Sequence, residues 1–309
     1  MGKQNQLVRK QHIVARWHLE KFADHAGWLW CYKRNIPAKR SRAKNECWER
    51  DFYECDVNGK RTENSYERWL KRIEDRAAPL HGRLLNRQQL SHQDSIAWAV
   101  YVASLFLRTK KVRAQFSARM VKRFRERTSS KDYICDLQYT LLKEGELVAV
   151  ENLRKQVEEL RAKMDGSTSF YHLMVLPPHT ASLAKVLLAK KWHVLDAGPE
   201  KFFVMSDCPV TTFEIVSGHV RAGSGFGRDG SSVFLPMTPM HVFVASPESI
   251  RWQQVGSPIA VDSMNLLTVR FAHQRVFSHV RSPDIQALVD SEINRIIFGK
   301  DAFVPANRD

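Results

Sequence analysis

His12, Glu74 and Asp207 have side chains suited to acid–base or metal chemistry, although they lie far apart along the chain. His12 titrates near neutral pH, which suits general acid–base catalysis. Asp207 follows the apolar run FFVMS and precedes Pro209, so we expect a carboxylate at the end of a strand. In metal-dependent nucleases such a carboxylate holds the ion that generates hydroxide, which predicts Mg²⁺ or Mn²⁺ at Asp207 and Glu74. The alternative is that Asp207 only forms an Asx-turn or a helix cap.

Glu67 and Glu74 are seven residues apart, a spacing that places both carboxylates on one face of a helix. We predict that they share a divalent ion with Asp207 or orient a catalytic base. The alternative is that they pair with Arg72 or Arg76 at the surface, where such pairs contribute little to stability.

Arg108, Gln11 and Asn265 complete the candidate site. Arg108 follows an apolar helix at the start of a basic stretch, so it either clamps a phosphate group with two hydrogen bonds or bridges to Glu74 in the core. Gln11 flanks His12, and Asn265 lies among apolar neighbours that predict a strand, where it would hold a turn or a substrate. The candidate catalytic residues are His12, Glu74, Arg108 and Asp207.

The positive charge of the chain is concentrated in its first 130 residues. The 309 residues carry a formal net charge of +15. Residues 1–130 hold 29 Lys and Arg against 13 Asp and Glu, whereas residues 131–309 hold 19 against 20. A positive field on one half attracts phosphates, so we expect nucleic acid as the partner. The residues predicted to bind it are Arg40, Arg42, Lys110, Lys111, Arg119, Lys122 and Arg123.

Several functional classes are disfavoured by motifs that the sequence lacks. It has no GxxxxGK[ST], HExxH or GxSxG motif, which argues against P-loop nucleotide hydrolysis and against the enzyme classes that the other two motifs mark. Five cysteines without a CxxC pair argue against disulfides and a zinc site, and Cys208 is expected to pack as a small apolar side chain. No run approaches the ~20 apolar residues that cross a bilayer, and the opening MGKQNQLVRKQH lacks the apolar core of a secretory signal. We therefore expect a cytoplasmic protein with no membrane partner.

Helical spacing of apolar residues dominates the basic half. It predicts a short helix over 11–23, a helix from Ser65 to about Pro79, and a long helix from Ser91 into a basic tail near residue 127. A further charged helix is expected over 147–164. The elements that must position the candidate site are therefore mainly helices in this half.

Strand patterns dominate the second half, where short apolar runs alternate with turn residues. In the first half only 27–34 predicts a strand, and it is followed by a basic, mobile loop over 33–44. The later predicted strands are 170–176, 202–206, 233–237, 241–245 and 266–271. Two helices, over 179–191 and 283–298, accompany them.

The expected fold class is α+β. A basic, mainly helical region over residues 1–165, with a short N-terminal strand, packs on a mixed, strand-rich region over residues 166–309. We expect the two regions to be intimately packed, with a single domain as the alternative.

Short motifs occur along the chain in an order that is found in a known family. They are Gln11-His12 with Leu19 and Phe22, Glu67 and Glu74, Arg108-Thr109, FVMSDCPV (203–210), LPMTP (235–239) and Asn265. In this order the sequence resembles the bacterial family called domain of unknown function 4238, although Cys208 stands where the family usually has Asn. The resemblance implies no established reaction. It does imply a setting, because family members occur among phage-defence genes.

The leading hypothesis is an anti-phage effector, or toxin, that binds nucleic acid through residues 1–130 and cleaves it as a metal-dependent nuclease, a hydrolase. One alternative is a non-enzymatic nucleic-acid-binding or phage-sensing module. A second alternative is an enzyme that acts on a nucleotide or another small phosphorylated ligand. For the effector we expect a phage-encoded trigger, and the oligomeric state stays open.

Overall fold

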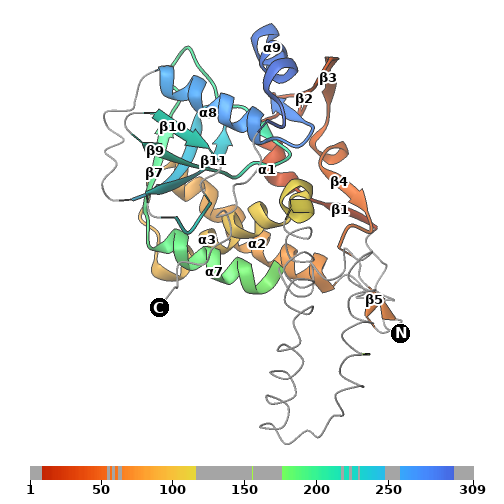
Figure 1. The fold of residues 1–309 in the computed structure, drawn as a ribbon, viewed down its shortest axis with the longest axis vertical. Coiled ribbons are helices and arrows are strands. Elements are labelled where there is room, and N and C mark those ends of the chain that lie inside the picture. Colours follow the sequence, from red (N-terminus) through yellow and green to blue (C-terminus); the bar gives the residue numbers. More distant parts are fainter. Residues whose placement is uncertain are drawn as a thin grey trace, which may run out of the picture.

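The structure is a computed structural model with a mixed α+β fold, as predicted. It describes residues 9–53, 56–57, 60–61, 65–115, 155, 176–216, 219–222, 225–228, 230–247 and 258–295. Helices are concentrated in the N-terminal half and strands in the C-terminal half (Figure 1). No helix in the described part of the chain is long and apolar enough to cross a membrane.

Three helices form one layer. Helices α2 (Ser65–Leu85) and α3 (His92–Leu107) pack against each other, and α7 (Leu176–Leu188) packs on α3 (Figure 1). A capping box begins α3 at the predicted start of that helix: Ser91 Oγ accepts from the backbone N–H of Asp94, and the Asp94 carboxylate accepts from that of Ser91. The apolar side chains of α3 are buried along most of its length, so this helix is central to the core.

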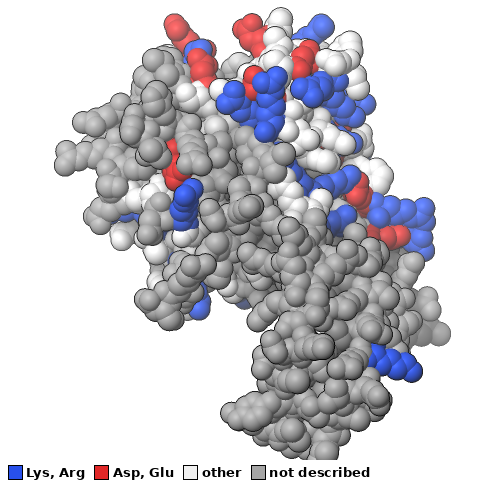
Figure 2. All heavy atoms as spheres, in the orientation of Figure 1, with Lys and Arg blue, Asp and Glu red and all other residues white. Residues whose placement is uncertain are grey.

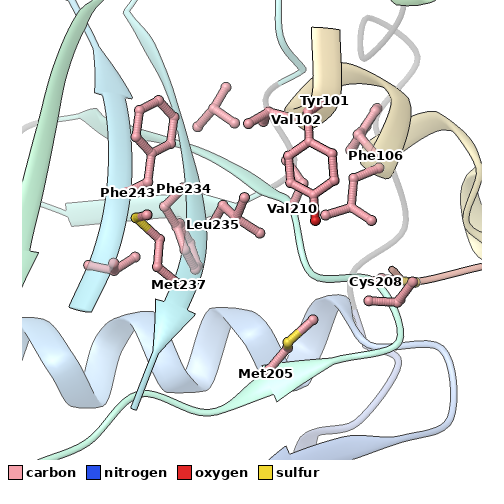
Figure 3. Packing of buried hydrophobic residues seen from close by; sticks show 14 of the residues in the cluster. Tyr101, Val102, Phe106, Met205, Cys208, Val210, Phe234, Leu235, Met237 and Phe243 are labelled. Atoms are coloured by element: carbon pink, nitrogen blue, oxygen red, sulfur yellow. The ribbon is translucent and has the colours of Figure 1, made fainter. Parts of the chain in front are cut away.

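A five-stranded antiparallel sheet packs on α3. Its order is β10–β9–β11–β12–β7. Its strands are β7 (Lys191–Asp196), β9 (Thr211–Val216), β10 (His219–Ala222), β11 (Ser231–Thr238) and β12 (His241–Ser246). Figure 3 shows side chains of β11 and β12 meeting those of α3 in the hydrophobic core, with Cys208 among them. Cys208 is fully buried, as expected for a packed apolar side chain, and burial raises the pKa of its thiol.

A four-stranded sheet joins the two halves of the chain. Its order is β3–β2–β13–β8, and its neighbouring strands are antiparallel. Its strands are β2 (Leu29–Lys33), β3 (Ile36–Ser41), β8 (Met205–Ser206) and β13 (Val276–Ser278). Strand β2 pairs with β13, with Cys31 opposite Phe277. The predicted regions 1–165 and 166–309 therefore share hydrogen-bonded backbone.

Short elements complete the described fold. Strand β1 pairs with β4, and β5 pairs with β6, each as an antiparallel ribbon. Helices α8 and α9 pack against each other. The bounds are β1 (Lys10–His12), α1 (Arg16–Glu20), η1 (Ala43–Asn45), β4 (Trp48–Arg50), β5 (Asp56–Val57), β6 (Lys60–Arg61), α8 (Pro258–Phe271) and α9 (Pro283–Glu292).

Two buried histidines anchor the LPMTP segment to the helices. His18 Nε2 lies 2.8 Å from the Pro236 carbonyl oxygen, and His81 Nε2 lies 3.0 Å from that of Met237. Because a carbonyl only accepts, each Nε2 carries the hydrogen. His18 Nδ1 lies 2.7 Å from the hydroxyl of Tyr101. Burial lowers the pKa of His18 to about 3 and that of His81 to about 4, so both rings are neutral.

Several predicted elements were wrong in kind or length. The predicted helix over 11–23 is strand β1 followed by the short helix α1, and the predicted loop over 33–44 is mostly strand β3 and η1. The predicted strand over 266–271 lies in helix α8, because a continuous apolar run fits a buried helix as well as a strand. Pro79 lies inside α2 rather than at its end.

The long basic helix is interrupted at Arg108, which is the C-cap of α3, and helical structure resumes at Lys110. Residues 116–154 and 156–175 lie outside the described residues. These ranges contain most of the basic tail, most of the helix predicted over 147–164 and most of the strand predicted over 170–176. The predicted strand over 27–34 is confirmed as β2, and the strands over 233–237 and 241–245 as β11 and β12.

Candidate functional site

A pocket of about 130 Å³ brings three of the four predicted catalytic residues together. His12 reaches it from β1, Glu74 from α2 and Arg108 from the end of α3. Glu67 lines it from α2 as well, because residues i and i+7 share one face of a helix. The remaining lining residues are Arg16, Leu70 and Lys71.

Arg108 lines this pocket and has two buried donors without a partner within the described ranges. Its side chain is 1% exposed, and Nη1 donates to Oε1 of Glu74 at 2.6 Å. Its Nε and Nη2 are buried and have no hydrogen-bond partner among the described residues. Burial by itself lowers the pKa of Arg108, but the charge of Glu74 and further groups outweighs it, so the net shift is upward and the guanidinium stays charged. The edge formed by Nε and Nη2 is suited to two oxygens of a carboxylate or phosphate.

His12 lines the same pocket with an unpaired nitrogen. Its ring hydrogen-bonds the backbone of Lys44, whereas Nε2 is buried without a partner in the described part of the chain. The bond to Lys44 raises the pKa of His12, so the ring donates it, and the donor is Nδ1. Burial first, and then the charges of Lys10 and Arg108, lower the pKa of His12 to about 4. The imidazole is therefore neutral at pH 7, and Nε2 keeps its lone pair.

Gln11 holds β1 in place from the opposite side of the strand. Its Oε1 accepts from the backbone N–H of Tyr53 at 2.6 Å, and the Tyr53 hydroxyl donates to the His12 carbonyl at 3.0 Å. These bonds fix the backbone that carries His12, so the structure gives Gln11 a positioning role.

Asp207 lies outside this pocket and braces the turn between α8 and β13. Its Oδ1 accepts from the backbone N–H of His273 at 2.8 Å. Its Oδ2 accepts from the backbone N–H groups of Gln274 at 2.9 Å and Arg275 at 3.2 Å. Burial raises the pKa of Asp207, and the bonds from His273 and Gln274 act in the opposite direction. Both oxygens are engaged by a distant turn rather than by a local Asx-turn or a helix cap, which favours a structural role, and the catalytic role stays a prediction.

Asp207 lines a second pocket, in which neighbouring charged groups are paired. Lys110 forms an ion pair with Glu49, and Arg275 Nη1 lies 2.9 Å from Oε2 of Glu46. Burial lowers the pKa of Lys110. The other lining residues are Ile13, Cys47, Trp48, His273 and Gln274.

The two carboxylates predicted to hold a cation, Asp207 and Glu74, line different pockets. The described residues also contain no group of three or more His, Cys, Asp and Glu that could hold a metal ion. Glu67 and Glu74 do share one pocket, and Mg²⁺ or Mn²⁺ binding there stays a prediction.

The predicted nucleic-acid-binding residues fall into different environments. The guanidinium groups of Arg40 and Arg42 lie over the ring of Trp28, 5.2 and 4.4 Å from its centroid. Lys111 is buried, and its Nζ donates to the Phe271 carbonyl at 3.0 Å, which is a structural role at the end of α8. Three of the predicted residues lie outside the described residues: Arg119, Lys122 and Arg123.

Asn265 lies on helix α8 and not on the predicted strand. Its Oδ1 accepts from the backbone N–H of Val204 at 2.9 Å, and its Nδ2 donates to the Phe202 carbonyl at 2.8 Å. These two bonds fasten the segment before β8 to α8. They favour the structural role for Asn265.

Arg16 and Lys71 line the first pocket, but the sequence analysis missed both. Lys71 was detectable, because it follows Glu67 by four residues and precedes Glu74 by three, which places it on the same helical face. Arg16 gave no such signal, because the segment over 11–23 is not one helix.

Comparison with known proteins assigns the family. The family model described as protein of unknown function (DUF4238) matches residues 10–282, a range that includes every residue lining the two pockets. No curated protein and no solved structure matches the chain. The family match covers most of the sequence, and the chain therefore belongs to the DUF4238 family.

Proposed function

We propose that this protein binds nucleic acid and hydrolyses a phosphodiester bond in the pocket of Arg108 and His12. The observation that carries the proposal is the buried Arg108 guanidinium, whose Nε and Nη2 lack a partner among the described residues although the side chain lines a pocket. An unpaired buried donor costs about 1–3 kcal/mol, and more when charged. A ligand with two oxygens that accept both hydrogens regains this free energy, and a phosphate group has that geometry.

The charges around the pocket support a phosphate ligand. The cations that line it, Arg16, Lys71 and Arg108, outnumber the carboxylates that do so, those of Glu67 and Glu74. Figure 2 shows lysine and arginine side chains, with acidic residues among them, on the side of the molecule that carries β1, β3 and β4 in Figure 1. A polyanion approaching this side meets an attractive field before it reaches the pocket.

His12 supplies the acid–base chemistry in this proposal. Its Nε2 accepts a proton from water as the water oxygen bonds to phosphorus. The bond from phosphorus to the leaving oxygen then breaks, and that oxygen takes a proton from solvent, which gives a phosphate monoester and a free hydroxyl. The bound phosphate offsets the charges of Lys10 and Arg108, so it raises the pKa of His12 from about 4 and makes Nε2 a stronger base. Glu74 acts as a positioning residue, because it holds Nη1 of Arg108.

In the cell this activity would serve anti-phage defence in the cytoplasm, in response to a phage-encoded trigger. The support for this role is the family resemblance. A phage-protection assay on cells that carry the gene, with or without His12→Asn, tests it.

The direct experiment incubates purified protein with labelled RNA, DNA and mononucleotides in Mg²⁺, Mn²⁺ or EDTA. We expect the wild type to cleave a polynucleotide. His12→Asn should lower the cleavage rate by at least about 100-fold while binding is retained. Arg108→Gln should bind the polynucleotide about 10- to 100-fold more weakly. Arg76→Gln is the matched control, because Arg76 is exposed on α2 and does not line the pocket.

The alternatives give different results. Binding without cleavage in any of the three conditions would leave a binding module. Hydrolysis confined to mononucleotides would identify an enzyme for small phosphorylated ligands. Equal binding by Arg108→Gln and the wild type would refute the phosphate site itself.

A further inference from the structure

The ribbon of β1 and β4 places an exposed aromatic side chain next to His12. Strands β1 and β4 lie side by side (Figure 1), and in their antiparallel register His12 lies opposite Trp48. Side chains directly opposite each other lie on the same face of a sheet, with Cβ atoms about 5 Å apart. Trp48 is 38% exposed. An aromatic side chain therefore lies on the same face of the ribbon as His12, where it lines the neighbouring pocket of Asp207.

The two rings are held by neighbouring residues of one turn. His12 donates to the backbone of Lys44, and Trp48 Nε1 donates to the carbonyl of Asn45 at 3.1 Å. Lys10, on the same face of β1, places its Nζ 4.4 Å from the centroid of the Trp48 ring. The hydrogen bond to Asn45 thus fixes the orientation of the indole, the Lys10 ammonium lies over its ring, and Trp48 as a whole stays 38% exposed.

The position of Trp48 differs from that of Trp28, another tryptophan of this half with cations at its ring. Arg40 and Arg42 both lie over Trp28, and Trp28 is half-buried. Two guanidinium groups lie over its ring, whereas Trp48 has the ammonium group of Lys10 over its ring and is 38% exposed, which leaves part of its surface available to a flat, uncharged partner.

We infer that Trp48 stacks an unpaired base of the nucleic acid whose phosphate binds Arg108, so the substrate is single-stranded. This inference rests on the proposed function. Bases in single strands have free faces and stack on exposed aromatic side chains, whereas bases inside a duplex are stacked on each other. The cation of Lys10 beside the ring adds attraction for the adjoining backbone phosphate. The base would then fix which phosphodiester enters the pocket beside His12.

The test measures binding of three fluorescent probes by anisotropy in EDTA, with the integrity of each probe checked on a gel. The probes are a single-stranded oligonucleotide, an abasic phosphodiester strand of the same length, and a duplex. We expect the wild type to bind the base-containing strand about 10- to 100-fold more tightly than the abasic strand, and more tightly than the duplex.

Trp48→Ala should abolish the preference for bases while the affinity for the abasic strand is unchanged. Trp48→Phe should keep most of the preference, and since both variants lose the hydrogen bond to Asn45, their comparison separates stacking from that bond. Met240→Ala, which removes an apolar side chain that is 41% exposed elsewhere, should leave the preference intact.

Two results would overturn the inference: equal affinity of the wild type for the base-containing and abasic strands, or an unchanged preference in Trp48→Ala. Tighter binding of the duplex would overturn it as well. Failure of the proposed function gives a separate result. If the proposed function fails, Arg108→Gln would not weaken the binding of any probe. The ratio of the affinities for the base-containing and the abasic strand would still measure the contribution of Trp48.

Discussion

Asp207→Asn should destabilise the fold, although the two side chains have nearly the same shape. Asp207 accepts three backbone N–H bonds through two oxygens, from residues 273, 274 and 275. Asn has one oxygen and one NH₂ group, so at least one of these N–H groups would face a donor. A hydrogen bond to a charged acceptor contributes about 1.5–3 kcal/mol, and an unsatisfied buried donor costs about 1–3 kcal/mol. We expect a loss of about 2–4 kcal/mol in the free energy of unfolding, which lowers Tm by roughly 3–6 °C.

The assay is urea and thermal unfolding followed by circular dichroism. Asp262→Asn is the matched control, because Asp262 pairs with Lys201 at a side chain that is 60% exposed, and its loss should cost less than about 1 kcal/mol. An Asp207→Asn protein that unfolds at the wild-type midpoint would refute the bracing role. If that same protein had lost nuclease activity or phage protection, Asp207 would be a catalytic residue after all.

Two further predictions concern charge in the core. Glu74→Gln removes the charged partner of Arg108, and because Glu74 is 21% exposed we expect the free energy of unfolding to fall by about 2–3 kcal/mol, less than for a fully buried pair. Inorganic phosphate should raise the Tm of this variant more than that of the wild type. A Tm that does not change with phosphate concentration would contradict the anion site. Stability should fall as the pH drops below about 6.5, because the pKa values of His18 and His81 are about 3 and about 4 in the folded chain and the unfolded chain takes up protons first. His81→Gln should flatten this dependence in urea titrations between pH 7 and 5, and a slope equal to that of the wild type would show that His81 does not contribute.

Helical geometry made part of the candidate site predictable. The seven-residue spacing placed Glu67 and Glu74 on one face of α2, and both do line one pocket. The bridge from Arg108 to Glu74 was one of two predicted roles for that arginine, and the structure contains it. His12 reaches the pocket from strand β1, and the spacing of apolar residues wrongly predicted a helix for that segment.

The position of Asp207 was not predictable, because it depends on the order of strands in a sheet. The apolar run before Asp207 indicated a strand correctly, as β8. Its neighbour β13 comes from a segment about 70 residues further along the chain, and no local pattern reports that pairing. The sequence therefore could not predict which backbone turn Asp207 binds. It also could not predict that Asp207 and Glu74 line different pockets.

The shared four-stranded sheet has a consequence for synthesis on the ribosome. The Tyr32 hydroxyl donates to the Val280 carbonyl, 248 residues further along the chain, and β2 pairs with β13 in the same region. At about 5–20 residues per second, β2 leaves the ribosome roughly 12–50 s before this partner exists. During that interval β2 has an unpaired edge of the kind that promotes aggregation. The nascent chain is therefore expected to need protection by a chaperone until β13 has been made.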